Sequence, residues 1–269
     1  MKKILFCLAI ICASQASYGQ PSRPIQTLDP AMIASFAPTG TLRVGINLGN
    51  PVLANENPVT RQMQGVTIDI SQEIGKRIGL PVKLIPFKTA GNTVDAVKTG
   101  EIDMVFVAID PIRGADINYT PAYIQIEGAY MVKANSPIKT NEQVDVSSNE
   151  IIVGKGSAYD LYLTREIKNA ALLRAPSSQA VVDDFVSGKG NVAAGVKQQL
   201  ESDAKRYDGL RMIPGRFMVI NQAIGIPKAR PQYEQTTAYL SGVITQLKQS
   251  GFVAQAMQRH QIEGAKVAD

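Results

Sequence analysis

Short apolar runs alternate with helical patterns of apolar residues along this chain. Residues 102–108 (IDMVFVA) are mostly apolar and rich in β-branched side chains, which is typical of a buried parallel strand. Four isoleucines between positions 68 and 78 recur at near-helical spacing, and Gly79 follows as a C-terminal stop. Strand-like runs at 41–47 and 81–87 flank that helix. The order of these elements predicts parallel strands joined by right-handed crossovers.

A second series of the same kind follows a polar stretch at 134–149. Strands are predicted at 151–153, 172–174, 192–194 and 210–213, helices at 158–169, 179–187, 197–206, 231–250 and 252–260, and crossing strands at 125–132 and 217–226. We therefore expect an α/β protein of two lobes, each with a mostly parallel sheet flanked by helices and with two strand crossings as the hinge. The predicted boundaries are 41–128 with 218–269 for the first lobe, and 129–217 for the second. The cleft between lobes is the expected binding place.

The N-terminal segment differs in composition from the rest. Residues 1–19 contain Lys2, Lys3 and then an apolar run at 4–13, as in a secretory signal peptide. That run is too short for a typical membrane-spanning helix, although an uncleaved anchor is the alternative. Residues 20–40 are proline-rich and are predicted to form a leader tail, with a helical turn after Asp29. We expect export to the periplasm.

Composition excludes several kinds of chemistry. Cys7 and Cys12 both lie in the predicted signal peptide, so the exported chain has no disulfide, thiol nucleophile or thiolate metal site. His260 is the only histidine and lies near the C-terminus, which argues against a Ser-His-Asp triad. The formal net charge is +5, or +3 without Lys2 and Lys3, and the basic residues are spread out. We expect neither nucleic-acid binding nor a metal or cofactor.

A charged loop follows the apolar run 102–108. Asp110 and Pro111 end the strand, and Arg113 follows. Open α/β sheets bind ligands at the carboxyl ends of their strands, and the planar guanidinium of arginine matches a carboxylate. Arg113 is thus a candidate ligand-binding residue. The alternative is a surface arginine paired with Asp110 or Asp116.

A turn at 154–157 (GKGS) precedes a predicted helix. It lacks the spacing of a phosphate-binding loop, but it offers free backbone N–H groups and the Ser157 hydroxyl at a helix N-terminus, which suits an anion. Alternatively Ser157 caps its own helix, and both roles are compatible. Glu127, in the first crossing, either faces the cleft or forms a hinge salt bridge.

Several motifs occur in a fixed order: TLRVG at 41–45, GVTIDI at 65–70, GEID at 100–103, and VGKGS at 153–157. With them the chain resembles the bacterial extracellular solute-binding proteins of family 3, the periplasmic amino-acid receptors of ABC importers. The resemblance implies the two-lobed, type II periplasmic binding protein fold. It also implies a monomer without catalytic activity that captures a small polar solute and delivers it to the membrane subunits of an ABC permease.

The resemblance also assigns roles to particular residues. Arg113 matches the arginine that clamps the ligand carboxylate, and Ser157 matches the hydroxyl of the second lobe. Tyr159 follows Ser157 by two positions, and Asn47 matches a polar position after the first strand. Asn92, in the turn before a predicted helix, is a further candidate.

The chain departs from the family pattern near both halves of the site. Asp110 stands where the family has threonine, and the segment from 103 to 113 is about two residues shorter. The acid that binds the α-ammonium group is absent, with Val196 or Lys197 near its place. A standard α-amino acid is therefore not expected to be held in the usual way. A positively charged ligand balanced by Asp110 or Glu127 is one hypothesis.

Two other functions remain open on the same scaffold. The family fold also hosts cyclohexadienyl dehydratases, and such an enzyme requires a general acid in the cleft, for which Asp110 and Glu127 are the candidates. The second is a sensory protein that hands its ligand to a membrane-bound partner. Permease genes next to the gene of this protein would favour transport over sensing.

Overall fold

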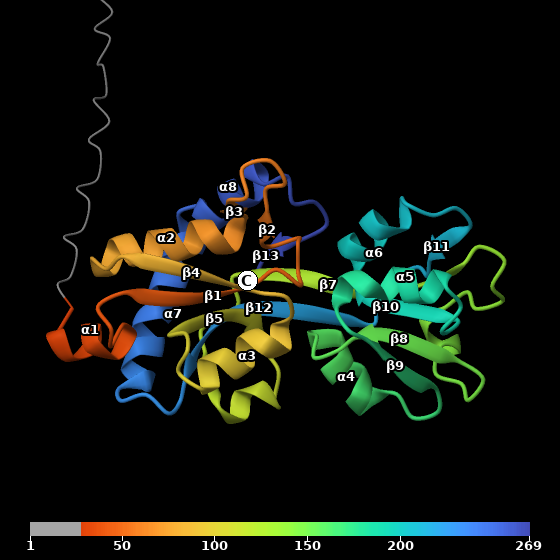
Figure 1. Cartoon of the computed structure of the whole chain (residues 1–269), viewed down its shortest axis with the longest axis horizontal. Coiled ribbons are helices and arrows are strands. Elements are labelled where there is room, and N and C mark those ends of the chain that lie inside the picture. Colours follow the sequence, from red (N-terminus) through yellow and green to blue (C-terminus); the bar gives the residue numbers. More distant parts are fainter. Residues whose placement is uncertain (1–27) are drawn as a thin grey trace, which may run out of the picture.

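The protein consists of two α/β lobes side by side, joined by a continuous sheet (Figure 1). The structure, a computed structural model, describes residues 28–269, so the predicted signal peptide lies outside the described residues. Along its main path the sheet follows the order β4 (Val82–Phe87), β1 (Leu42–Asn47), β5 (Met104–Ala108), β12 (Met218–Pro227), β7 (Ile124–Lys133), β10 (Val192–Val196), β8 (Glu150–Gly154) and β9 (Ala171–Ala175).

Five short strands lie off this main path. Strands β6 (Ile117–Tyr119), β11 (Leu210–Met212) and β13 (Lys266–Val267) pair with β12 or β7. Strands β2 (Asn55–Glu56) and β3 (Met63–Gln64) form a separate hairpin between β1 and α2 (Val66–Ile78). We did not predict β2, β3, β6 or β13, each of which is only two or three residues long.

Strands β7 and β12 belong to both lobes. In the first lobe β1 runs parallel to β4 and β5, and in the second β8 runs parallel to β9 and β10. Strand β12 pairs with β5 over Gln222–Gly225 and with β7 over Met218–Gln222. Strand β7 then pairs with β10 over Gly128–Met131. The prediction of two α/β lobes with two strand crossings is confirmed. The exact residues at which one lobe ends and the other begins remain a prediction.

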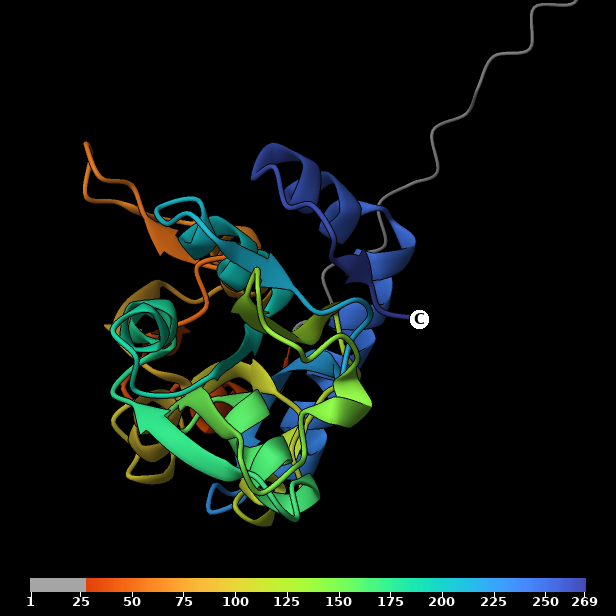
Figure 2. The same cartoon turned by 90° about the vertical axis from the view of Figure 1, so that its right-hand side faces the viewer.

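Helices cover both lobes. The first lobe carries α1 (Pro30–Phe36), α2 (Val66–Ile78), α3 (Ala90–Lys98), α7 (Tyr233–Gln249) and α8 (Phe252–Arg259), and the second carries α4 (Ala158–Glu166), α5 (Val181–Val186) and α6 (Lys197–Ala204). Helices α7 and α8 stack along one side of the molecule (Figure 2). None of the helices within 28–269 has the length and apolar character needed to cross a membrane.

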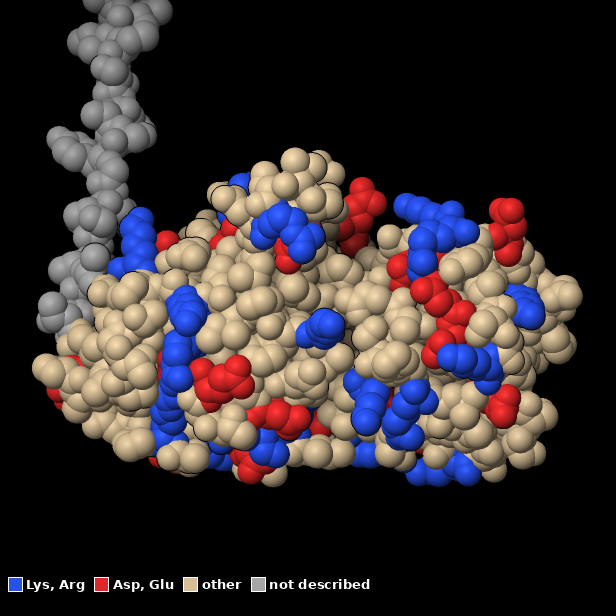
Figure 3. Space-filling model, viewed as in Figure 1, with Lys and Arg blue, Asp and Glu red and all other residues tan. Residues whose placement is uncertain are grey.

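The predicted periodicities match the burial of the side chains. The isoleucines at 68, 70, 74 and 78 are all buried on α2, and Gly79 ends that helix at a φ of 71°. Every residue of β5 is buried, as the continuous apolar run predicted. On the face shown in Figure 3, Lys and Arg are interspersed with Asp and Glu, without a large patch of one sign.

Part of the predicted leader tail lies in the folded body. Asp29 accepts a hydrogen bond from the Ala31 N–H (3.1 Å) and begins α1 with Pro30. Phe36 is 2% exposed, and its ring meets Tyr239 of α7 edge-on at a centroid distance of 5.6 Å. The segment is therefore stabilised by a helix some 200 residues later in the chain, which local sequence patterns do not reveal.

Candidate functional site

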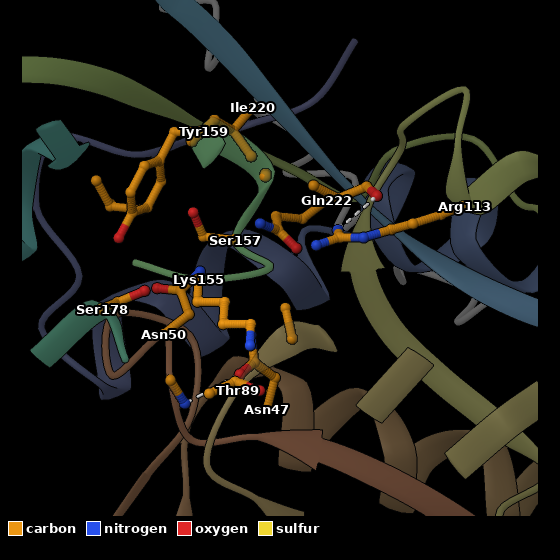
Figure 4. A pocket seen from close by; sticks show the side chains of 15 residues that line it. Asn47, Asn50, Thr89, Arg113, Lys155, Ser157, Tyr159, Ser178, Ile220 and Gln222 are labelled. Carbon is orange, nitrogen blue, oxygen red and sulfur yellow. Dashed lines mark hydrogen bonds between the residues drawn. The ribbon is translucent and has the colours of Figure 1, made fainter. Parts of the chain in front are cut away.

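A small cavity lies between the two lobes. Its lining residues, the interlobe site, are Asn47, Gly49, Asn50, Thr89, Ala90, Ala108, Arg113, Lys155, Ser157, Ala158, Tyr159, Ser178, Val196, Ile220 and Gln222 (Figure 4). Its volume is about 30 Å³, which holds roughly two or three water molecules. The lobes therefore contact each other almost directly, and an amino-acid-sized solute requires them to separate.

Arg113 reaches the interlobe site from the first lobe. Strand β5 ends at Ala108, and Asp110 then folds the loop by accepting hydrogen bonds from the N–H groups of Ile112 (2.8 Å) and Arg113 (3.3 Å). This turn aims the guanidinium of Arg113 back under the end of its own strand. There Nη1 donates to the Ala108 carbonyl (3.2 Å) and Nη2 to the Gly156 carbonyl of the second lobe (2.8 Å).

The guanidinium of Arg113 is a buried charge with neutral partners. Arg113 is 5% exposed, and within residues 28–269 it forms no ion pair with a carboxylate. Burial lowers the pKa of Arg113, but an arginine stays protonated in proteins. A buried cation without an ion pair is costly, because two carbonyl dipoles and the nearby Asp110 carboxylate replace its hydration only in part. The interlobe site is therefore suited to an anion, and Arg113 is not the surface arginine of the alternative prediction.

The second lobe contributes the N-terminus of α4. Ser157 is 7% exposed, and its Oγ accepts a hydrogen bond from the Asp160 N–H (3.0 Å) while the side chain lines the interlobe site. The two predicted roles of Ser157, as helix cap and as a cleft residue, are thus compatible in one position. Tyr159 is 2% exposed and also lines the site, and burial raises its pKa. Gly156 faces Gly91 of the first lobe so closely that a Cβ on either glycine would contact the backbone of the other.

Lys155 is a second cation at the interlobe site. It belongs to the turn before α4, is exposed, and extends toward Asn47 and Thr89 of the first lobe (Figure 4). Its ammonium group has no hydrogen-bond or ion-pair partner among the described residues. We did not predict a role for Lys155, although it was visible in the GKGS turn, because only the packing of the lobes shows which way it points.

Neutral polar side chains surround these cations. Asn47 accepts a hydrogen bond from the Gly49 N–H (3.0 Å). Asn50 is 9% exposed, and its Oδ1 has no partner among the described residues. Gln222, 6% exposed on β12, lies between Ser157 and Arg113 in Figure 4. We did not predict Asn50, Thr89, Ser178 or Gln222, since polar residues in loops and crossing strands carry no local signal of a shared site.

Two predicted residues with carboxylates do not line the interlobe site. Oδ2 of Asp110 lies 2.9 Å from Nη1 of Arg165 on α4, and this ion pair links the two lobes. The angle between the two groups does not fit a hydrogen bond. Glu127 pairs with Arg216 (2.6 Å), and Lys197 lies 3.9 Å away. Both carboxylates are already balanced by cations. The hypothesis of a positively charged ligand held by Asp110 or Glu127 therefore gains no support from this geometry.

Asn92 also lies outside the lining of the site. It is exposed in the first turn of α3, where its N–H donates to Oγ1 of Thr89 (3.1 Å). Val196, at the end of β10, does line the site. It is one of the two residues predicted from the sequence to lie near the position of the acid that this chain lacks. Of the seven predicted residues, the structure thus brings Asn47, Arg113, Ser157 and Tyr159 together.

Two lobes joined by two strands, with a polar site between them, define a type II periplasmic binding protein. Residues 42–262 match the family model of the bacterial extracellular solute-binding proteins, family 3, so the chain belongs to this family. It is 24% identical over 205 residues to the glutamine-binding protein of an ABC transporter from Bacillus subtilis (strain 168), covering 71% of this chain and 73% of that protein.

Solved structures share the fold. The solute receptor for L-cysteine of Neisseria gonorrhoeae superposes with a TM-score of 0.72 at 20% identity, over 84% of this chain and 92% of that one. A histidine kinase sensor domain with similarity to periplasmic binding proteins gives a TM-score of 0.73 at 15% identity, over 85% and 98% of the two chains. At these identities the likeness shows the fold alone.

Proposed function

We propose that this protein is the periplasmic substrate-binding component of an ABC importer, which captures a small polar solute with a carboxylate and delivers it to a membrane permease. The observation that carries the proposal is the guanidinium of Arg113, buried and charged between two lobes with only carbonyl partners. A ligand carboxylate would replace the Gly156 carbonyl and accept two hydrogen bonds from one planar group. Ser157 and the N-terminus of α4 would stabilise the same negative charge.

Closure of the lobes would bury the ligand. Several contacts already connect the lobes, among them the hydrogen bond from Arg113 to Gly156, the ion pair between Asp110 and Arg165, and a hydrogen bond from Gln179 Nε2 to the Leu48 carbonyl (2.8 Å). Strands β7 and β12 would act as the hinge, and the closed form would be the one a permease recognises.

Family membership supports a solute of the amino-acid type and a transporter partner. The relative from Bacillus subtilis is named as a glutamine-binding protein of an ABC transporter. The family is extracellular, which supports the periplasmic location expected from the N-terminal segment. A monomer suffices, because one chain supplies both walls of the cleft.

The geometry favours binding over catalysis. A dehydratase on this scaffold requires a free general acid in the cleft, and the two candidates, Asp110 and Glu127, are paired with Arg165 and Arg216 away from its lining. The proposal therefore assigns no catalytic residue.

A thermal-shift screen of the purified protein tests the proposal. A ligand at 100 times its Kd stabilises the folded state by about 2.7 kcal/mol, which corresponds to roughly 5–10 °C in Tm for a chain of this size. We expect at least one small carboxylate to produce such a shift and Arg113→Met to abolish it. Turnover of a prephenate-like acid without any shift would favour the enzyme. Loss of solute uptake on deleting the neighbouring permease genes would separate transport from sensing.

A further inference from the structure

The charge balance of the interlobe site is positive. Arg113 and Lys155 are its charged residues, and the other described residues that line it are neutral. Arg113 is fixed and buried, whereas Lys155 is exposed on the opposite wall and extends across the cleft (Figure 4). A solute between them would meet cations from both lobes.

The carboxylates on neighbouring elements offset this charge only in part, because Asp110 lies near Arg113 but forms its ion pair with another arginine. Oδ2 of Asp110 lies 2.9 Å from Nη1 of Arg165. Asp160, in the first turn of α4, accepts from Nε of Arg174 (3.0 Å) through Oδ1 and from the Gly156 N–H (2.9 Å) through Oδ2. Both acids are buried and fully used by these partners. They cannot turn into the site without leaving a cation or a backbone donor unpaired.

The remaining wall of the site does not suit an ammonium group. Val196, 9% exposed at the end of β10, and Ile220, 1% exposed on β12, line it with aliphatic carbon. One buried acceptor without a partner among the described residues is Oδ1 of Asn50, a neutral oxygen that a hydroxyl or amide N–H satisfies. An ammonium group would meet no countercharge there and would be repelled by Arg113 and Lys155.

We propose that the solute of this protein is a small organic acid without an ammonium group. Its carboxylate would lie on Arg113, and a second acidic or carbonyl oxygen would face Lys155. Its remaining hydroxyl or amide groups would bind Asn50 and Gln222. This inference rests on the proposed function, since it names the class of solute that the same site takes.

Matched pairs of compounds test the inference by isothermal titration calorimetry. Each pair differs in the ammonium group: L-glutamate against glutarate and 2-oxoglutarate, L-aspartate against succinate, and L-glutamine against 4-carbamoylbutyrate. We expect the deaminated member of the best pair to bind at least tenfold more tightly. Tighter or equal binding of the amino acid would overturn the inference and leave the proposed function intact. Binding of no compound in the panel would overturn both.

Variants of the site make the test specific. Lys155→Gln should weaken binding of the best dicarboxylate at least tenfold, because it removes one of two cations. Lys189→Gln, which affects a surface ion pair with Asp184, should leave it unchanged. Val196→Asp should shift the preference toward the amino acid of the same pair, and the neutral Val196→Asn should not. An unchanged affinity in Lys155→Gln would contradict the inference, whether or not Val196→Asp folds.

Discussion

Replacing Arg113 with methionine should abolish ligand binding and at the same time stabilise the protein. Methionine has a similar length and fills the same space without a charge. Arg113 is 5% exposed, donates to neutral carbonyls and forms no ion pair, and the nearby Asp110 carboxylate offsets its charge only in part, so the folded protein bears a desolvation cost that the proposed anionic ligand would reduce. A residue kept for binding at the expense of stability is a common feature of functional sites.

The size of the effect follows from the contacts. The variant loses two hydrogen bonds to the carbonyls of Ala108 and Gly156, each worth about 1 kcal/mol net. The variant no longer bears the desolvation cost of the buried guanidinium, which is several kcal/mol. The net change is a stabilisation of about 1–2 kcal/mol, or an increase of roughly 2–8 °C in Tm. Loss of the clamp should weaken carboxylate binding by about 2–5 kcal/mol, which is at least about thirtyfold.

Urea unfolding and calorimetric titration measure the two effects separately. The matched control is Arg43→Met in the same lobe. Nη2 of Arg43 donates to Oδ1 of Asp103 (2.6 Å), whose side chain is fully buried. Because its removal leaves a buried carboxylate with Arg230 as its remaining ion-pair partner, the control should destabilise the protein by about 2 kcal/mol or more.

A fall in stability of Arg113→Met, similar to that of the control, would refute the reasoning. It would show that Arg113 holds the lobes together as a structural residue. Unchanged carboxylate binding in a folded variant would refute the clamp itself.

Two further predictions concern closure and pH. Arg165→Gln breaks the interlobe ion pair with Asp110 and should favour the open form by about 1–2 kcal/mol, which X-ray scattering without ligand would show as a larger radius of gyration. The control Arg174→Gln breaks an ion pair within the second lobe and should leave the radius unchanged. Equal radii for the unchanged protein and both variants would contradict the prediction. Burial raises the pKa of Tyr119 to about 12 from 10.0, so the folded state keeps this proton more tightly than the unfolded chain. The contribution of Tyr119 to stability should be complete below pH 10 and decline as the pH rises from 10 to 12. Because burial also raises the pKa of Tyr123 and Tyr130, Tyr119→Phe should lessen the decline seen in urea unfolding without removing it. An identical slope in the variant would exclude a contribution from Tyr119.

The sequence predicted the frame of the site because the relevant signals are local. A continuous apolar run marks β5, and the charged loop after it marks the position of Arg113. Glycine and serine before a helical pattern mark the turn that carries Ser157. Period and turn chemistry act over a few residues, so they can be read without knowing the partners of each element.

The contents of the site depended on contacts between distant residues. Asp110 stands three residues before Arg113 and reads as its neighbour, yet its side chain pairs with Arg165 on the other lobe. Glu127 is likewise held by Arg216. An ion pair depends on which side chains the packed lobes bring within reach, and this is not encoded in the spacing along the chain.

The sequence by itself determined two α/β lobes, their crossing strands and an arginine at the end of a buried strand, because strand and helix periods act locally. Only the tertiary structure decided the charge of the cleft. It turned Asp110 and Glu127 toward cations outside the lining and brought Lys155 across from the second lobe. The ligand preference that we propose therefore depends on how charges separated by tens of residues pair when the lobes pack together.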